Sequence, residues 1–295
     1  MSASIGICAG VVTYNPDIRL LKENLDSLLS QVSMVYIVDN GSDNVEDIKS
    51  CLEGKSALRL LRNQENGGIA KALNQLCMVA RQTGYGWILT MDQDSLCAPD
   101  MVTILSAYTD NSAYGIIAPK IEFWDGDLLF KTIGNSNLAT QEIDACITSG
   151  SLTRIEAWEK VGGFDEWYFI DRVDNEFCTH LATKGYKILR ANAAILSQKA
   201  GQMRYITLPW MGRLLLPYYN EMRNYYICRN SVYYFRKYCH DINLKHHVLA
   251  FAYAQIVKLL FESGRWATLR STCRGILDGK KKIIEYKNYI ESSAS

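Results

Sequence analysis

The stretch IGICAGVVTYNPDIRLLKENLDSLLSQVSMVYIVD, residues 5–39, carries two periodicities that decide the fold. An apolar run over residues 5–12 stops at Thr13-Tyr14-Asn15-Pro16, and a second apolar run covers residues 34–39. Between them apolar side chains recur at helical spacing, at Ile18, Leu21, Leu25, Leu28 and Leu29. The segment predicts a strand, a helix and a second strand. Asn15 is expected to cap this helix, with the proline after it in the first helical position.

The same alternation continues along the chain, with a short strand at 58–61, a helix at about 69–83 and a strand at 87–91. Strands that alternate with helices predict an α/β fold with a parallel sheet. Ligands of such sheets collect at the carboxyl ends of the strands. We therefore expect one crevice to be lined by Thr13, Asp39, Asn66 and Asp92.

Beyond residue 116 the alternation weakens. Residues 120–150 are interpreted as rich in loops, and residues 154–161 and 174–184 as two short helices. From Tyr205 the composition changes again, because ten aromatic residues lie between Tyr205 and Tyr238 among Arg and Lys. This part of the chain is expected to form a helical appendage.

Composition limits the class of protein. The chain has 295 residues, of which 48% are hydrophobic, enough to bury a large core and to exclude a disordered chain. Nine cysteines without any C-x-x-C pair fit reduced core thiols, so no disulfide and no structural zinc are expected. The first residues lack a signal-peptide pattern, which predicts a cytoplasmic protein.

Charge is divided unevenly along the chain. Residues 1–200 hold 17 Lys and Arg against 25 Asp and Glu, a net charge of −8, while residues 201–295 hold 15 against 6, a net charge of +9. A basic tail indicates an anionic partner, such as a phospholipid surface or a pyrophosphate-linked substrate. A solvated basic face is the alternative, and the acidic body argues against nucleic acid.

The longest apolar stretch of the tail, residues 248–261, is interrupted by Gln255 and Lys258. It falls short of the ~18–20 apolar residues that a membrane span needs. A helix that lies on a membrane surface fits the mixture of aromatic and basic side chains. Burial of these rings against the rest of the protein is the alternative interpretation.

Two carboxylates, Asp92 and Asp94, follow the apolar strand at 87–91. Mutual repulsion and desolvation make such a pair costly, and a hard divalent cation offsets that cost. Mg²⁺ or Mn²⁺ is typically held by one or two carboxylates together with phosphate oxygens. Solvated acids on an ordinary loop are the alternative, but the position at a strand end favours a metal site.

Two other segments follow predicted strands. In Val38-Asp39-Asn40-Gly41-Ser42, Asp39 could accept the imide N–H of a pyrimidine or bond a ribose hydroxyl, and the alternative is a plain turn. Asn66-Gly67-Gly68 precedes a helix, where glycines let backbone N–H groups approach a ligand near the positive helix end. A simple helix-entry turn explains the second segment equally well.

In order along the chain, VVTYNP, VDNGS, NGGIAKALN, MDQDS, GGFDEWYFIDRVDNEFC and RNYYICRN cover roughly residues 5–230. The series resembles the inverting glycosyltransferases of the GT-A fold, of the family 2 type, and in particular the rhamnosyltransferase branch that builds O-antigen and capsule. The resemblance implies a mostly parallel central sheet with a C-terminal helical appendage. Residues 1–204 would form the catalytic domain, with a nucleotide-binding half at 1–95 and an acceptor half at 96–204, and residues 205–295 the appendage.

The resemblance also implies site residues. The donor contacts would be Thr13, Tyr14, Asn15 and Asp39 for the nucleotide, Asn66 and Gly68 for ribose and phosphates, and Asp92 for the sugar diphosphate. Asp94 would be the main ligand of Mg²⁺ or Mn²⁺, with Asp92 beside it. The family places a Glu-Asp pair after G-G-F-D-E, with the Asp as general base. Here that place reads Val173-Asp174, so Asp174 is the predicted base.

The chain departs from the family pattern at two places. The first acid of the pair is missing, and Asp171 is a partial replacement, while Glu176 is a second candidate for the base. Ser197-Gln198-Lys199-Ala200-Gly201 stands where many relatives have a histidine, which leaves a third metal ligand in question. Guanidinium and ammonium groups could meet a diphosphate or the acceptor, at Lys199, Arg223 and Arg229. Surface or helix-packing roles are the alternative for these three.

The implied activity is transfer of one sugar, with inversion, from a dTDP- or UDP-sugar to an acceptor hydroxyl. Rhamnose from dTDP-rhamnose and a lipid-linked, growing surface polysaccharide follow from the resemblance alone. They place the protein at the inner face of the cell membrane as a peripheral protein, with its oligomeric state open.

Two other functions fit part of the sequence. A metal-dependent nucleotidyltransferase would want a glycine- and basic-rich loop after the first strand, and Thr13-Tyr14-Asn15-Pro16 lacks one. A non-catalytic binder would use the Arg- and Tyr-rich tail on nucleic acid or another anionic surface.

Overall fold

The computed structural model describes residues 6–125, 128–134, 137–199, 203–208, 212–217, 220–238, 244–261 and 264–293. The chain forms two compact units. The first consists of Met1–Phe169 and Val173–Ala200, and the second of Ile170–Arg172 and Gly201–Ser295. The break in contacts thus falls after residue 200, and three residues from the middle of the chain belong with the C-terminal unit. The functional division expected after residue 204 stays a prediction.

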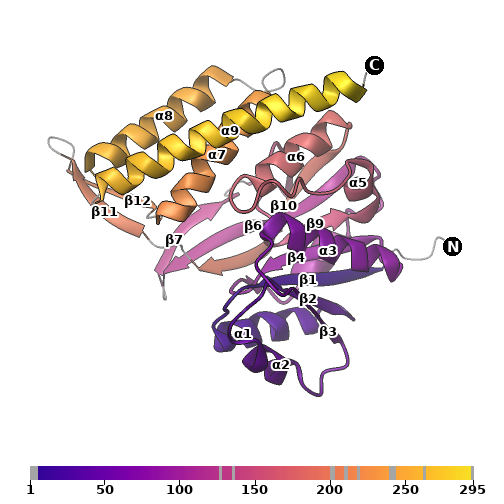
Figure 1. The fold of residues 1–295 in the computed structure, drawn as a ribbon. Helices are drawn as coiled ribbons and strands as arrows, with labels where there is room; N and C mark the ends of the chain where they lie inside the picture. The colour runs from indigo at the N-terminus through magenta and orange to yellow at the C-terminus, as the bar shows by residue number, and fades with distance from the viewer. Residues whose placement is uncertain are drawn as a thin grey trace. The chain divides into compact units, whose positions relative to one another are not determined.

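The first half of the first unit follows the predicted alternation (Figure 1). Strand β1 (Ile7–Thr13) pairs in parallel with β2 (Val35–Asp39) and with β4 (Trp87–Asp92), and β2 pairs in parallel with β3 (Leu58–Arg62). The connections contain α1 (Ile18–Leu29), α2 (Val45–Leu52) and α3 (Ile69–Gln82). The predicted α/β class is confirmed, while α2 was not predicted.

Helices cover both faces of this sheet. Successive side chains of a strand point to opposite faces, so the apolar side chains of each strand need packing partners on both faces. On β1, Ala9 and Val11 join a core cluster with Leu21 and Leu25 of α1. Gly10 faces the other way, where a Cβ would lie 2.9 Å from the Leu76 side chain of α3. All five residues of β2 are buried, as expected for a strand covered on both faces.

The second half of the first unit extends the sheet. It contains β5 (Leu96–Cys97), α4 (Met101–Ser106), β6 (Tyr114–Asp125), β7 (Leu128–Ile133), β8 (Thr140–Ile143), β9 (Ser151–Arg154), α5 (Ile155–Lys160), α6 (Val173–Thr183) and β10 (Lys187–Lys199). Within the described residues the strand order is β3-β2-β1-β4-β9-β6-β10-β5, with β7 on β6 and β8 on β10. Strand β9 runs antiparallel to both of its neighbours, so the sheet is mixed.

The interpretation of residues 120–150 as loops was wrong in part. Strand β6 extends to Asp125, and β7 and β8 follow within the same stretch. Strand β8 pairs with β10 while Gln141 and Glu142 remain exposed. A strand beside the main path of a sheet needs no continuous apolar run, so its pattern is hard to distinguish from that of a loop.

The second unit contains the predicted helices, α7 (Glu221–Lys237), α8 (Leu244–Phe261) and α9 (Arg265–Ser293), preceded by an antiparallel pair, β11 (Met203–Leu208) and β12 (Gly212–Pro217), that was not predicted. Helices α7 and α9 pack closely, because a Cβ on Gly275 or Gly279 would lie 2.5 Å from the carbonyl oxygen of Tyr225 or Arg229. Among the helices of the described ranges, none combines the length and the apolar character that crossing a membrane would take.

The start of α1 differs from the prediction. Asp17 caps this helix, since its side chain accepts from the N–H groups of Arg19 and Leu20. Asn15 instead has a left-handed backbone with φ of 46°, and its side-chain oxygen accepts the N–H of Asp43 at 2.8 Å. The prediction that Asn15 caps the helix was wrong, because α1 begins at Ile18 and Asp17, two residues after Asn15, directly precedes it.

The described cysteines are free thiols, and several lie in the core. Burial raises the pKa of Cys8 and that of Cys97 to about 12. These thiols therefore stay protonated and unreactive at neutral pH. Cys239 lies outside the described residues.

The start of α3 is built against a distant part of the chain. Gly68 has φ of +88°, and a Cβ there would lie 2.7 Å from the carbonyl oxygen of Phe169. The same oxygen accepts the N–H of Ile69 at 2.7 Å. The glycine thus permits close contact between the entrance of α3 and the loop that precedes α6.

Substitution Gly68→Ala should reduce stability more than Gly84→Ala. Both glycines have φ above +80°, but a Cβ at Gly84 meets nothing within 4 Å. The shared backbone strain costs about 1–2 kcal/mol in each variant, and the contact with Phe169 adds to it in Gly68→Ala alone. Urea denaturation of both variants measures the difference. Equal losses would contradict the importance of the contact.

Candidate functional site

The parallel register brings three predicted site residues to one edge of the sheet. Thr13 lies opposite Asp39 in the pairing of β1 with β2, and Val12 lies opposite Asp92 in the pairing of β1 with β4. Thr13 also donates its hydroxyl to Asp39 Oδ1 at 3.3 Å. The carboxyl ends of β1, β2 and β4 therefore meet, as the alternation of strands and helices predicts.

Asp39 is fully buried and organises the turn that follows β2. Its carboxylate accepts the backbone N–H of Ser42 at 3.2 Å and the hydroxyls of Ser42 and Thr13. Gly41 completes the turn with φ of +81°. These contacts are those of the turn that was the alternative interpretation, and a nucleotide contact by Asp39 stays a prediction.

The loop after β1 is tied to both neighbouring strand ends. The N–H of Tyr14 donates to Gln93 Oε1 at 2.8 Å, and the N–H of Asn15 donates to Ser42 Oγ at 2.8 Å. The Tyr14 side chain is 48% exposed. Gln93, the central residue of the D-x-D sequence, therefore joins the first loop to the carboxylate turn, a role that the sequence analysis missed.

Asn40 joins the turn after β2 to the entrance of α3. Its Nδ2 donates to the carbonyl oxygen of Gly68 at 3.0 Å, and its Oδ1 accepts from Asn63 Nδ2 at 3.0 Å. Asn66 Oδ1 in turn accepts the N–H of Gly68 at 2.9 Å. The predicted nucleotide-contacting turns at 38–42 and 66–68 thus form one hydrogen-bonded unit.

The turn that carries Asp92 and Asp94 is held by a buried residue of α1. Asn24 Nδ2 donates to the carbonyl oxygens of Asp92 at 3.0 Å and Ser95 at 2.6 Å. The N–H of Asp92 donates to Ser149 Oγ at 3.0 Å. The sequence signal for Asn24 was a polar residue on the apolar face of a helix.

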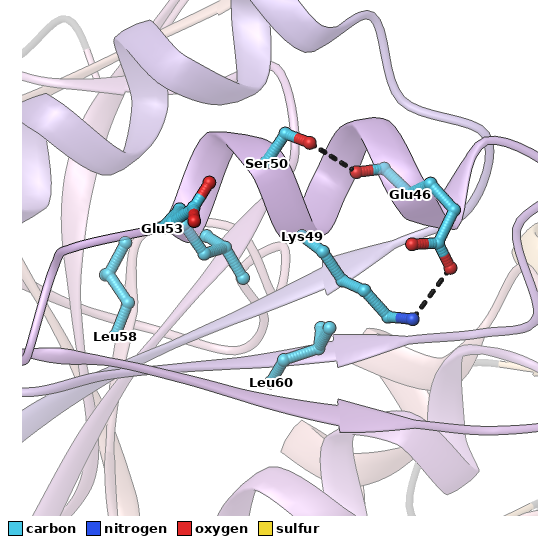
Figure 2. Close-up of a pocket in the computed structure, with 7 residues that line it drawn as sticks. Glu46, Lys49, Ser50, Glu53, Leu58 and Leu60 are labelled. Carbon is cyan, nitrogen blue, oxygen red and sulfur yellow. Dashed lines mark hydrogen bonds and ion pairs between the residues drawn. The ribbon is translucent and has the colours of Figure 1, made fainter.

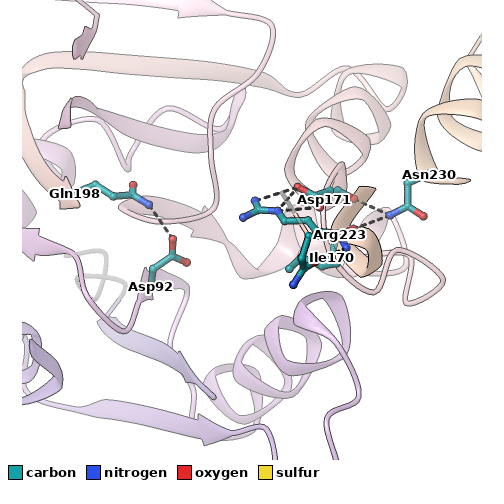
Figure 3. Close-up of polar contacts among 7 residues, drawn as sticks. Asp92, Ile170, Asp171, Gln198, Arg223 and Asn230 are labelled. Carbon is teal, nitrogen blue, oxygen red and sulfur yellow. Dashed lines mark hydrogen bonds and ion pairs between the residues drawn. The ribbon is translucent and has the colours of Figure 1, made fainter. Parts of the chain in front are cut away.

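The carboxylate pair itself has a mixed environment. Asp92 Oδ2 accepts from Gln198 Nε2 at 3.0 Å (Figure 3). Gln198 Oε1 is buried and has no hydrogen-bond partner among the described residues. Asp94 is half-buried, and Lys199, the next residue of β10, is exposed.

Asp92, Asp94 and Gln198 Oε1 fit a cation that takes its remaining ligands from substrate or water. The described residues contain no group of three or more His, Cys, Asp or Glu that could hold a metal ion. Two carboxylates and a buried, unmatched amide oxygen suit Mg²⁺ or Mn²⁺, which fills its remaining positions with phosphate oxygens and water. The assignment of Asp94 and Asp92 as ligands stays a prediction.

The two candidates for the base differ in accessibility. Asp174 lies in the first turn of α6, is half-buried and accepts the N–H of Asn175 at 2.8 Å. Glu176 is 1% exposed, with His180 Nδ1 at 4.0 Å from its Oε1. A base must reach an acceptor hydroxyl, so the structure favours Asp174.

Helix α6 is connected to both parts of the site already described. Phe169, which precedes it, contacts the entrance of α3. Cys178, one turn after Asp174, donates to the carbonyl oxygen of Cys146 at 3.8 Å. The loop from Cys146 continues to Ser149, which bonds the backbone of Asp92. The predicted base and the carboxylate pair thus belong to one contact network.

Arg223 and Arg229 belong to the second unit and have partners there. Arg223 Nη2 lies 3.1 Å from a carboxylate oxygen of Asp171. Arg229 Nε donates to Asn230 Oδ1 at 2.9 Å, and its guanidinium lies 4.6 Å from the ring centroid of Tyr226. A contact between these arginines and a diphosphate or acceptor stays a prediction.

A surface depression lies elsewhere, between α2 and β3 (Figure 2). Its lining includes Leu58 and Leu60 and an ion pair of 2.7 Å between Lys49 and Glu46. None of the predicted site residues lines it. The strand ends therefore remain the candidate site.

Comparison with solved structures identifies the fold as that of the GT-A transferases. GalNAc-T7 with UDP, GalNAc and Mn²⁺ superposes with a TM-score of 0.58 at 12% identity, over 68% of this chain and 45% of that one. *S. aureus* TarS 1–349 with UDP-GlcNAc gives 0.57 at 17% identity, over 82% of this chain and 69% of that one. At these identities the likeness defines the fold alone, which is that of the GT-A transferases.

Sequence comparison gives the family. Residues 8–161 match Glycosyl transferase family 2, so the chain belongs to glycosyl transferase family 2. The chain is 27% identical over 254 residues to the dTDP-rhamnosyl transferase RfbF of Shigella flexneri, covering 78% of this chain and 80% of that protein. An uncharacterized glycosyltransferase of Haemophilus influenzae is 28% identical over 111 residues, 36% of this chain and 40% of the other.

Substitution Asp94→Ala should remove the effect of a cation on donor binding. Titration calorimetry with UDP and with dTDP, each with and without Mn²⁺, should show affinity at the metal-free value in both conditions. Asp100→Ala is the control, since Asp100 is an exposed carboxylate a few residues further on. Tightening by Mn²⁺ that survives in Asp94→Ala would reject Asp94 as a ligand.

Proposed function

We propose that the protein transfers rhamnose from dTDP-rhamnose, with inversion, to a hydroxyl of a lipid-linked, growing surface polysaccharide. The observation that carries the proposal is the similarity to a dTDP-rhamnosyl transferase along most of both chains, at 27% identity. The site agrees with it, because strand-end turns suited to a nucleotide and an accessible carboxylate at the start of α6 belong to one contact network.

The chemical step needs one base. Asp174 accepts the proton of the acceptor hydroxyl while that oxygen attacks the anomeric carbon. The bond from this carbon to the diphosphate oxygen breaks, and the nucleoside diphosphate leaves with the electron pair. Attack from the face opposite the leaving group inverts the configuration. General base catalysis contributes roughly 10²–10⁴ in rate.

The leaving group needs charge stabilisation. Asp94 and Asp92 would hold Mg²⁺ or Mn²⁺, which when bound neutralises charge that grows on the diphosphate. The protein keeps the two carboxylates in place through Asn24 and Ser149, which fix the backbone of their turn. Preorganised carboxylates do not have to reorient when the substrate arrives.

The nucleotide would occupy the ends of β1 and β2. The proposed contacts come from Thr13, Tyr14, Asn15 and Asp39, with Asn66 and Gly68 toward ribose and phosphates. The half-exposed ring of Tyr14 offers a flat apolar face with a polar tip for a base. Since Asp39 is enclosed by its own turn, it acts on a nucleotide mainly by shaping the loop that surrounds it.

A nucleotidyltransferase is a weaker proposal. It would release pyrophosphate and would use basic residues in the first loop, whereas this loop bonds Gln93 and Ser42 instead. A non-catalytic binder would leave the carboxylate pair and Asp174 without a purpose.

A donor screen tests the proposed activity. Release of nucleoside diphosphate from dTDP-rhamnose and from UDP-sugars, with Mg²⁺ or Mn²⁺ and a lipid-linked acceptor, should be fastest with dTDP-rhamnose. In Asp174→Asn turnover should fall by about 10²–10⁴ with donor KM nearly unchanged. Glu176→Gln is the matched carboxylate control on the same helix. Preference for another donor refutes rhamnosyl transfer, and a near-normal rate in Asp174→Asn removes this residue from its role.

We also propose that the second unit attaches to the inner face of the cell membrane. On α8 four of the exposed apolar residues recur at intervals of four, three and four and so form one stripe, Leu249, Tyr253, Ile256 and Leu260, with the exposed Val248 beside it. Trp266 at the start of α9 is 82% exposed. With a net charge of +9 over residues 201–295, the stripe suits an anionic lipid surface.

The protein should sediment with vesicles that contain phosphatidylglycerol and be released as salt is raised, since the Debye length shrinks from about 10 Å at 0.1 M to about 3 Å at 1 M. The double variant Ile256→Glu with Leu260→Glu should bind at least about tenfold more weakly, because two apolar contacts are lost and two negative charges face the lipid. Met78→Glu changes an exposed apolar residue of α3 and should bind normally. Equal binding of both variants, or none by the wild type, would refute the attachment.

A further inference from the structure

The three residues before α6 have an unusual backbone. Asp171 and Arg172 have φ of 63° and 67°, so two consecutive residues other than glycine are left-handed. L side chains rarely adopt this conformation, and it persists only when surrounding contacts enforce it. Asp174 lies three residues after Asp171, so this segment leads directly into the first turn of α6.

A buried amide holds this segment from α7. Asn230 Nδ2 donates to the carbonyl oxygen of Ile170 at 2.7 Å and to that of Asp171 at 2.8 Å (Figure 3). Asn230 is fully buried. One NH₂ group therefore donates to two successive carbonyl oxygens. This pattern is expected of a residue that stabilises one backbone conformation.

The orientation of this amide is set by its neighbour. Arg229 Nε donates to Asn230 Oδ1 at 2.9 Å, so the oxygen is turned toward Arg229 and the NH₂ toward the segment. The guanidinium of Arg229 lies 4.6 Å from the ring centroid of Tyr226, and burial lowers its pKa without removing its charge at neutral pH. The two donors of Asn230 thus point at the carbonyls by chemical necessity.

The side chains of the segment are held by the same helix. Arg223 donates through Nε and Nη2 to the carboxylate of Asp171 at 3.1–3.3 Å. Arg172 donates through Nε to Ser231 Oγ at 3.2 Å, with its guanidinium 5.3 Å from the ring centroid of Phe235. Each residue of Ile170–Arg172 therefore contacts α7.

Helix α7 is in turn braced by α9. Gly275 and Gly279 allow backbone approach, and Asn224 Nδ2 donates to Ser271 Oγ at 2.8 Å and Thr272 Oγ1 at 3.0 Å. Because α9 holds α7 in place, α7 can impose a conformation on Ile170–Arg172.

We propose that Asn230 and Arg223 are positioning residues for the reaction: they hold Ile170–Arg172 in its left-handed path and thereby orient Asp174. The proposal rests on the proposed role of Asp174 as general base. Misplacement of a reacting group by about 1 Å can cost on the order of 10² in rate. The proposed nucleotide contacts at the ends of β1 and β2 come from other loops, so loss of the Asn230 or Arg223 contacts should act mainly on turnover.

The test compares two buried asparagines of the same helix. Asn230→Ala should lower kcat by about 10–100-fold, with donor KM within about twofold of the wild type. Asn224→Ala removes an equally buried amide whose partners are on α9. Asn224 braces α7 without contacting the segment itself, so this variant should lower Tm by a similar amount and lower kcat much less than Asn230→Ala does. Equal losses of kcat in both variants would show a structural effect and overturn the proposal.

Arg223 gives a second variant that does not remove a buried group, since its side chain is 44% exposed. Arg223→Met should lower kcat, and Arg223→Lys should recover part of the loss by restoring the charge next to Asp171. Normal kcat in Asn230→Ala and Arg223→Met, with Asp174→Asn impaired, refutes the positioning role of Asn230 and Arg223. The proposed function then remains intact. Normal kcat in Asp174→Asn refutes the base itself.

Discussion

The parallel pairing of β1 with β2 and β4 is the constraint on which the rest of the site depends. It sets Thr13 opposite Asp39 and Val12 opposite Asp92, so residues far apart in the chain meet at one edge. The register is fixed by burial, since a slip of one residue would turn Ala9 and Val11 away from the core cluster. The part of the chain that matches the family, residues 8–161, spans these strands.

Side-chain amides hold the loops at these strand ends. Asn24 fixes the carboxylate turn, Asn40 joins two turns, and Gln93 ties the first loop to the D-x-D sequence. An amide offers two N–H donors and an acceptor, so it can bond several backbone groups that would be costly to bury alone. The residues that we propose to act on substrate are carboxylates, above all Asp94 and Asp174.

Periodicity predicted much of the first unit but little of what supports the site. The strands ending near Asp39 and Asp92 stand out because they are continuous apolar runs, and their meeting follows from the topology of parallel sheets. Strand β8 has no such run and β7 has one of only three residues, and their stretch was interpreted as rich in loops. Asn24 acts on residues 68 and 71 positions away, and Asn230 on residues about 60 away, so no local pattern reveals the partners of either one.

Distance along the chain also explains why the prediction that Asn15 caps α1 was wrong. Its partner, the N–H of Asp43, comes from the turn after the next strand, and that turn exists in place only once the sheet has formed. Capping of α1 was left to Asp17, which needs nothing beyond its own helix.

The amides that hold these loops share one further property, which is that none of them gains or loses a proton in the range where proteins stay folded. The hydrogen bonds that Asn24, Asn40 and Asn230 donate therefore do not depend on acidity through their own side chains. The turn after β2 departs from this rule, because the carboxylate of Asp39 holds it together.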